Sequence, residues 1–146
     1  MRSEPWKVRQ YCYFWIASPV VTASEITELL GVTPDRVGVR GSRRAQPKPV
    51  PIEHSWELRY EPHAPIDEQA SDVLRRIEPA AALVRTLTSR DDVCAGLMMV
   101  RYFDDEDGGY GAMSWRLAPA QIALLADMGA SIDADEYAGD FTAHQP

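Results

Sequence analysis

Aromatic, arginine and carboxylate side chains alternate with apolar ones along several strand-like segments of this chain. In the first segment, Tyr11, Tyr13 and Trp15 alternate with apolar residues. Successive side chains of a strand point to opposite faces, so the three rings would share one face of a sheet. The other side chains expected on that face are Glu57, Arg59, Arg116, Asp133, Asp135 and Tyr137. Because aromatic and arginine side chains dominate interface energetics, this face predicts a surface for a ligand or protein partner.

The carboxylates of the same face offer an alternative in catalysis. Two carboxyl groups can divide the acid and base roles when their surroundings separate their pKa values. Glu57 with Asp133 or Asp135 could do so, while Arg59 or Arg116 held an anionic substrate. The hypothesis is therefore a small enzyme acting on an anionic small molecule, and it competes with a non-catalytic binding module.

A basic segment is a second candidate site. Residues 36–48 contain five cations and no acid, in a chain whose net charge is −7. Arginine forks match phosphate oxygens, so the segment is either an anion-binding loop or a solvated one. Its arginines are Arg36, Arg40, Arg43 and Arg44. No aromatic residue interleaves them and the chain is acidic overall, which argues against nucleic-acid binding and against anionic membranes.

Residues typical of metal and cofactor sites do not form a recognisable pattern. The three histidines stand apart from one another at 54, 63 and 144, and none has metal-ligand spacing. The acidic run 104–107 fits a solvated loop better than a calcium loop, and the glycine-rich run 108–111 fits a hairpin better than a phosphate cradle. We therefore expect no metal, no cofactor and no catalytic residue of a known motif.

Elements that could position these residues follow from hydrophobic periodicity. Alternation predicts strands over 8–16, 55–61, 95–103, 113–117 and 131–137. Helices are expected from the capping box at Thr22 to Gly31, over 66–87 with a break at Pro79, and from Pro119 to Gly129. Residues 35–52, rich in Gly, Arg and Pro, are predicted to be a long loop. The order β-α-β-α-β-β-α-β predicts an α+β two-layer sandwich, a mainly antiparallel sheet of about five strands with helices on one face.

Length and composition place the chain among ordinary globular proteins. At 146 residues, with 45% hydrophobic and 25% charged residues, it is expected to be a single domain. Its core would span 8–138, with a frayed tail at 139–146. No apolar run is long enough to cross a bilayer and no signal-peptide core is visible, so we expect a cytoplasmic protein with free thiols at Cys12 and Cys94.

Three segments carry a resemblance to a known family. They are residues 26–34, the stretch Ser55–Leu58 after the glycine-bearing loop, and the acidic-apolar ending Gly129–Tyr137. Together they resemble the bacterial domain of unknown function 4279 family across residues 11–138. Ala134 stands where that family commonly has isoleucine, and Glu136 is an added residue. The resemblance implies the α+β fold and a cytoplasmic location, and it implies no catalytic residue.

The leading hypothesis is a non-catalytic module that binds a protein partner, for example an immunity-type inhibitor of a toxin. The ring-bearing face has no nucleophile, metal set or cofactor motif beside it in the sequence. We also expect Tyr11, Tyr13 and Trp15 to be shielded from water, since three exposed rings approach the apolar area that soluble monomers tolerate. A second copy of the same face, in a homodimer, would provide that shielding, and the alternatives are a ligand or partner and a covering by the long loop 35–52.

Overall fold

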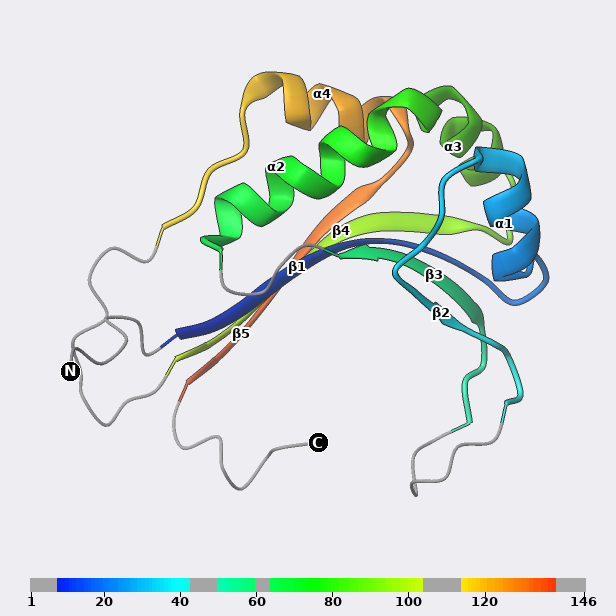
Figure 1. The fold of residues 1–146 in the computed structure, drawn as a ribbon, viewed down its shortest axis with the longest axis horizontal. Helices are drawn as coiled ribbons and strands as arrows, with labels where there is room; N and C mark the ends of the chain where they lie inside the picture. Colours follow the sequence, from blue (N-terminus) through cyan, green and yellow to red (C-terminus); the bar gives the residue numbers. More distant parts are fainter. Residues whose placement is uncertain (1–7, 43–49, 60–63, 104–113, 139–146) are drawn as a thin grey trace.

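The computed structural model describes residues 8–42, 50–59, 64–103 and 114–138 and shows a five-stranded sheet with helices on one face (Figure 1). The strands are β1 (Val8–Ser18), β2 (Arg36–Gly38), β3 (His54–Arg59), β4 (Cys94–Phe103) and β5 (Ser131–Ala138). They lie in the order β2-β3-β1-β4-β5, antiparallel except for the parallel pair of β4 and β5. The predicted α+β two-layer sandwich is confirmed.

Local sequence signals begin and end the helices as expected. In α1 (Ala23–Leu30), the Thr22 hydroxyl accepts from the Glu25 N–H at 3.1 Å, and Glu25 accepts from the Thr22 N–H at 3.3 Å. This reciprocal capping box satisfies two amides of the first turn. Gly31 ends the helix with φ at 69°, a left-handed conformation that glycine adopts without steric cost.

The long helical segment is broken where proline interrupts it. It consists of α2 (Ile66–Ile77), a 3-10 turn η1 (Glu78–Ala80) and α3 (Ala81–Thr88). Pro79 lies in the 3-10 turn, because proline has no N–H for an α-helical hydrogen bond. The last helix, α4 (Pro119–Asp127), has its proline at the first helical position, where that N–H is not needed.

The core lies between the helices and one face of the sheet. On β1, Cys12, Phe14 and Ile16 are buried against the helical layer, which leaves Tyr11, Tyr13 and Trp15 on the other face. Trp56 of β3 is fully buried, and its indole N–H donates to Thr27 Oγ1 at 3.0 Å. The alternation predicted for β1 and β3 is therefore confirmed. Within the described residues, no helix is both long and apolar enough to cross a membrane.

Two predicted elements differ from the structure. Arg36–Gly38 forms the edge strand β2 instead of part of a loop, since the prolines of this region begin only at residue 47 and do not interrupt its pairing with β3. Residues 114–118 form no strand. The Arg116 N–H instead donates to Asp67 Oδ1 of α2 at 3.1 Å.

The position of Arg116 in the helical layer follows from the parallel pairing of β4 and β5. Parallel neighbours require a crossover connection, because a hairpin would return the chain antiparallel. The chain therefore leaves β4, passes through the helical layer and α4, and returns to β5 (Figure 1). Arg116 was wrongly predicted to lie on the ring-bearing face. The predicted hairpin at 104–111 and the predicted tail 139–146 lie outside the described residues.

Candidate functional site

The candidate site is the sheet face opposite the helices, here called the open face. The sheet arches, its convex side carries the helices, and none of the described helices lies on its concave side (Figure 1). The strand register places these residues on the concave side: Tyr11, Tyr13, Trp15, Arg36, Glu57, Arg59, Gly96, Met98, Val100, Tyr102, Asp133, Asp135 and Tyr137. Except for Arg116, every sheet-face residue predicted from the sequence is on this face.

Arg59 forms the centre of the face together with two neighbours. It lies directly opposite Tyr13 in the pairing of β1 with β3. Its guanidinium carbon is 4.4 Å from the centre of the Tyr13 ring and 5.3 Å from that of Tyr11. Glu57 Oε1 accepts a hydrogen bond from Arg59 Nε at 2.8 Å and forms an ion pair with Arg59 Nη2 at 2.8 Å. The carboxylate thus fixes the cation in position over the rings, where cation–π attraction adds to the ion pair.

Two residues from outside the face hold the end of β3 that carries Arg59. Asp35 Oδ2 accepts from the Arg59 N–H at 2.8 Å and from Arg76 Nη1 at 2.9 Å. Arg76 Nη1 also donates to the Arg59 carbonyl at 2.9 Å. Burial raises the pKa of Asp35, but the hydrogen bonds and charges of Arg76 and Arg59 outweigh it and leave the pKa lowered. Asp35 and Arg76 are positioning residues that sequence reasoning missed, because 41 residues separate them.

Trp15 depends on the glycine beside it. It pairs with Glu57 on one side and Gly96 on the other. A Cβ at Gly96 would lie 2.6 Å from Ser131 Oγ and 2.9 Å from Cε2 and Cζ2 of Trp15, so the indole and the Ser131 hydroxyl occupy the space that a side chain would need. The Trp15 Nε1–H is buried, and among the described residues it has no hydrogen-bond partner. A glycine inside the apolar run 95–103 was the available signal for this close approach.

Tyr11 and Tyr13 remain protonated well above neutral pH. Burial, followed by the charge of Tyr102 and a hydrogen bond with it, raises the pKa of Tyr11 to about 12. Burial and the charge of Glu57 raise the pKa of Tyr13. The rings of Tyr11 and Tyr13 stack with centres 6.1 Å apart, and those of Tyr102 and Tyr137 with centres 4.9 Å apart. The face therefore offers neutral hydroxyls beside apolar rings.

Asp133 and Asp135 lie at the far side of the face, on the edge strand β5. They pair with Met98 and Val100 of β4 and are exposed. Three strand spacings separate β5 from β3, so Glu57 lies roughly 14 Å or more from both. That separation exceeds the roughly 5–9.5 Å between paired carboxylates in glycosidases. Glu57 and the β5 carboxylates therefore do not form the acid-base pair that the enzyme hypothesis requires.

The two described arginines of the predicted anion-binding loop, Arg36 and Arg40, have different surroundings. Arg36 lies on the open face, opposite Glu57. Arg40 lies beyond β2, where its Nη1 donates to the Pro19 carbonyl at 2.9 Å and its N–H donates to His54 Nδ1 at 3.1 Å. Arg43 and Arg44 lie outside the described residues. Arg36 therefore contributes to the open face, whereas Arg40 is part of the structure at the end of the sheet.

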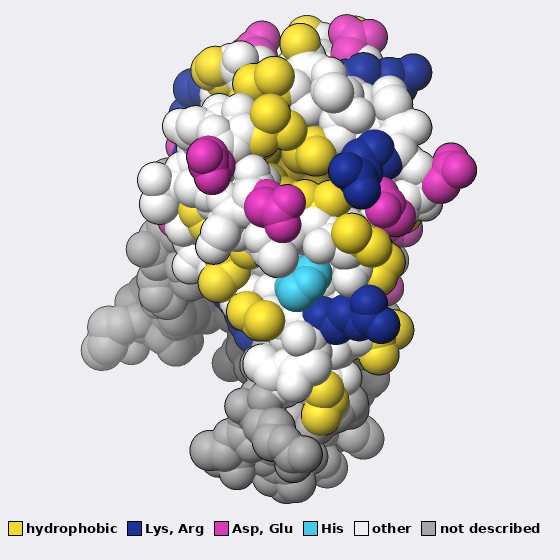
Figure 2. Space-filling view, turned by 90° about the vertical axis from the view of Figure 1, so that its right-hand side faces the viewer, with side chains coloured by type: hydrophobic (Ala, Val, Ile, Leu, Met, Phe, Trp, Pro, Cys, Tyr) yellow, Lys and Arg dark blue, Asp and Glu magenta, His cyan; other side chains and the backbone are white. Residues whose placement is uncertain are grey.

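The rings of the open face are partly covered within the chain itself. Tyr11, Tyr13 and Trp15 are each half-buried, and Val100, which pairs with Tyr11 across β1 and β4, is only 5% exposed. Apolar side chains that are more exposed than these rings gather around the end of the molecule that carries α1, β2 and β3 (Figure 2). Among them are Val37, Val39 and Ile52. The apolar area available to a second copy at the open face is therefore smaller than the sequence alone suggested.

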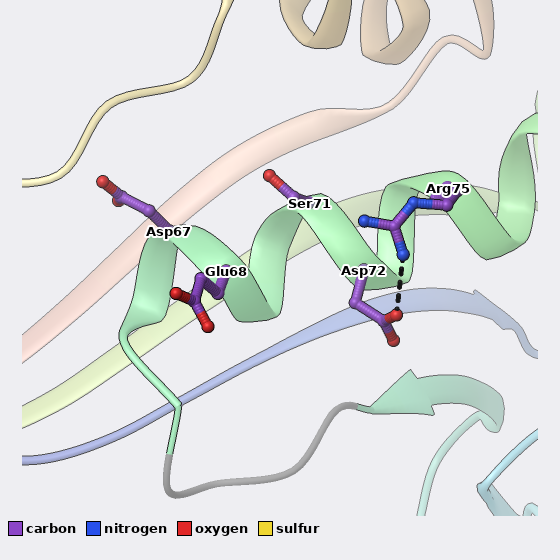
Figure 3. Close-up of a pocket in the computed structure, with 5 residues that line it drawn as sticks. All are labelled: Asp67, Glu68, Ser71, Asp72 and Arg75. Atoms are coloured by element: carbon purple, nitrogen blue, oxygen red, sulfur yellow. Dashed lines mark hydrogen bonds and ion pairs between the residues drawn. The ribbon is translucent and has the colours of Figure 1, made fainter.

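A shallow depression of about 330 Å³ lies on the opposite layer, along α2 (Figure 3). It is lined by Asp67, Glu68, Ser71, Asp72 and Arg75. Arg75 Nη1 pairs with Asp72 at 3.0 Å, and Asp67 accepts the Arg116 N–H, so two carboxylates of the depression already have partners.

Among the described residues, no group of three or more His, Cys, Asp or Glu side chains is placed to hold a metal ion. Both described cysteines are free thiols, with Cys12 buried and Cys94 exposed.

The fold and site define a class: an α+β protein with one helical layer and an aromatic sheet face on which none of the described helices lies. The family model described as Domain of unknown function (DUF4279) matches residues 7–139. The chain belongs to this family, which confirms the resemblance noted in its sequence. A search of curated proteins and a search of solved structures each gave no match.

Proposed function

We propose that this protein is a non-catalytic binding module that holds a protein partner on its open face. The observation that carries the proposal is the Arg59 guanidinium, fixed by Glu57 and stacked on Tyr13 at 4.4 Å. Arginine and tyrosine are the residue types most enriched among energetically dominant interface positions. Asp35 and Arg76 further restrict the backbone of Arg59. Little side-chain freedom is therefore left to lose when a partner binds.

The arrangement around this centre also supports partner binding. The half-buried rings on β1 and the Arg59 guanidinium, which Glu57 holds over Tyr13, form an aromatic centre, while further charged side chains lie on the outer strands β2 and β5. Arg36 gives the β2 side a positive character, and Asp133 and Asp135 make the β5 side negative. An apolar centre with a polar rim is the usual anatomy of a protein interface. The opposed charges would set the orientation of a partner.

Catalysis has less support from the same geometry. The carboxylates proposed as acid and base lie three strands apart, and Arg116 lies in the helical layer. An immunity-type inhibitor remains one specific form of the proposed module, since an inhibitor acts by covering a partner's site and needs no chemistry of its own. The acidic net charge of −7 suits a cationic partner, for which it would accelerate association.

Affinity capture with matched variants tests the proposal. The tagged protein, Tyr13→Ala, Arg59→Ala and the control Arg75→Ala on α2 are each immobilised and exposed to lysate of the source cells. Arg75 is 69% exposed on the opposite layer, so its loss should change nothing. A partner held by the wild type and the control should lose at least about thirtyfold in affinity for the two face variants, the size expected for a central interface residue. Equal capture by all four folded proteins would overturn the proposal.

A homodimer through the open face is the competing use of the same residues. Light scattering over a wide concentration range distinguishes the two. A wild-type dimer that becomes monomeric on Tyr13→Ala would assign the face to a second copy. A wild-type monomer that captures a partner through Tyr13 would assign it to that partner.

A further inference from the structure

The outer edge of β5 is an unpaired strand edge. β5 is the last strand of the sheet and pairs only with β4 in the described structure. It is eight residues long, and all residues from Ser131 to Tyr137 are exposed. The opposite edge strand, β2, has three residues. A long edge presents a row of N–H and C=O groups to which another chain can add as a strand.

This edge lacks most features by which proteins block strand addition. Short length, proline, charged side chains (lysine above all) and bulges are the common ones. β5 contains no proline and no lysine, and its charged residues are the carboxylates Asp133, Asp135 and Glu136. Its pairing with β4 runs without interruption from Gly96↔Ser131 to Phe103↔Ala138, so there is no bulge. Within the part of the chain that the structure describes, the backbone groups of its outer side are therefore unpaired and regularly spaced.

Contacts with β4 and with the end of α3 hold β5 in place, on the side away from its outer edge. Arg101, 7% exposed, donates from Nε to Glu136 Oε2 at 2.9 Å. The Tyr137 ring stacks on Tyr102 of β4. At the start of the strand, Gly129 turns the chain with φ at 69°, and Thr88 Oγ1 donates to the Met128 carbonyl at 2.7 Å. An added strand would meet a preformed edge and need not order it.

Charge determines which strand can add. Asp133 and Asp135 lie on one side of the edge and are exposed. Neither is in an ion pair within the described residues, and Asp133 Oδ2 accepts a long hydrogen bond from Ser131 Oγ at 3.4 Å. Directly opposed like charges destabilise strand pairing, and opposite charges stabilise it. A second copy added antiparallel through β5 would set these carboxylates against their own equivalents. A strand with basic side chains on the open-face side would neutralise them.

We propose that the outer edge of β5 binds an extended, basic segment of a protein partner as a sixth strand. This inference rests on the proposed protein-binding function and names the chemistry of the partner at the β5 side of the open face. It uses the backbone of β5 and the carboxylates of Asp133 and Asp135, whereas the aromatic centre uses side chains of β1 and β3.

The probe is an acetylated eight-residue peptide in which lysine alternates with valine, labelled for fluorescence anisotropy. It should bind saturably, and the same peptide with glutamate in place of lysine should not bind. The double variant Asp133→Asn, Asp135→Asn should bind roughly two- to thirtyfold more weakly, as expected for two cross-strand charge pairs. Asp67→Asn with Glu68→Asn on α2 is the control, because it changes net charge equally at exposed positions of the other layer. Equal weakening by both double variants would overturn the inference.

Two further peptides separate backbone pairing from charge attraction alone. One carries N-methyl groups on every lysine and the other on every valine. Only alternate residues of an added strand direct their N–H groups to the neighbouring strand. One of the two methylated peptides should therefore lose binding while the other retains it. If both bind, or both fail while the unmethylated peptide binds, strand addition is overturned.

The two variants of the aromatic centre, Tyr13→Ala and Arg59→Ala, make the two proposals distinguishable. Tyr13→Ala and Arg59→Ala should leave peptide affinity within about twofold, because neither residue is on β5 or its neighbour β4. If the peptide does not bind wild type although partner capture depends on Tyr13, only the β5 inference fails. If the peptide binds as described and capture does not depend on Tyr13, only the aromatic centre fails.

Discussion

The indole of Trp15 occupies the position where a side chain on Gly96 would begin. The two residues are paired across β1 and β4, and a Cβ on Gly96 would approach Trp15 Cε2 and Cζ2 to 2.9 Å. Real Cβ atoms do not come this close to neighbouring carbons. A glycine on β4 therefore allows a large ring on β1 to lie across the middle of the open face.

Gly96→Ala should consequently displace Trp15 and destabilise the fold. Overpacking of this kind costs about 1–3 kcal/mol in free energy of unfolding, measurable by urea denaturation with tryptophan fluorescence. The same Cβ would also lie 2.6 Å from Ser131 Oγ, a hydroxyl that can turn away by rotation about the Cα–Cβ bond. The destabilisation should therefore shrink when Gly96→Ala is made in a Trp15→Leu background, because the ring, which cannot move aside as easily, is gone. An equal loss in both backgrounds would show that the cause is the backbone of residue 96 or the Ser131 contact and not the indole.

Gln69 binds the backbone of β1 beyond the described end of β3, and its removal should be costly. β3 ends opposite Tyr13, and beyond that point the Cys12 N–H donates to Gln69 Oε1 at 2.9 Å. Gln69 Nε2 donates to the carbonyls of Gln10 at 3.2 Å and Ala64 at 2.8 Å. Gln69 is fully buried, so Gln69→Leu leaves buried backbone groups unpaired and should lower the free energy of unfolding by about 2 kcal/mol or more.

The matched control for this change is Gln121→Leu on α4. Gln121 also joins two elements, accepting from the Ala118 N–H at 2.7 Å and donating to Ser71 Oγ at 2.9 Å. It is only partly buried, so water can replace these bonds, and its loss should cost less than about 1 kcal/mol. Chemical denaturation of both variants gives the comparison. Equal destabilisation would argue against burial as the reason Gln69 matters.

The stabilisation contributed by Asp35 should depend on pH. Its pKa lies below the ordinary value of 3.8, so the charged form is favoured in the folded state. The stabilisation is complete above the ordinary value and is lost as pH falls through the lower, folded-state pKa. Because Asp35 is 40% exposed, Asp35→Asn should cost no more than about 1 kcal/mol at neutral pH. Denaturation curves of the two proteins should converge at acidic pH; a constant difference would contradict the role of the charge.

The two described thiols should differ strongly in reactivity. Cys12 is 1% exposed, and burial raises its pKa to about 12, whereas Cys94 is exposed. Thiolates are the reactive form, so a chromogenic aromatic disulfide should modify one cysteine in the native protein and both after denaturation. Cys94→Ser should remove the native reaction and leave the reaction of the denatured protein at one thiol. Rapid labelling of Cys12 in native Cys94→Ser would show that the core opens readily.

Features set by near neighbours in the chain were predictable from the residues alone. The capping box of Thr22 and Glu25 and the glycine end of α1 involve residues a few positions apart, so their chemistry is visible in the sequence. The shared face of Tyr11, Tyr13 and Trp15 follows in the same way from the two-residue period of a strand. The family match over residues 7–139 agrees with motifs already visible in those local patterns.

Which strands are neighbours was decided only by the tertiary structure. The sequence shows an alternating Glu57 and Arg59, but only the pairing of β3 with β1 sets Arg59 over Tyr13. The same information separates Glu57 from the β5 carboxylates by three strands and moves Arg116 into the helical layer. Local periodicity tells which face a side chain takes, and it carries no information on strand order. Order depends on hydrogen bonds and packing between residues distant in the chain, as between Gln69 and Cys12, 57 positions apart.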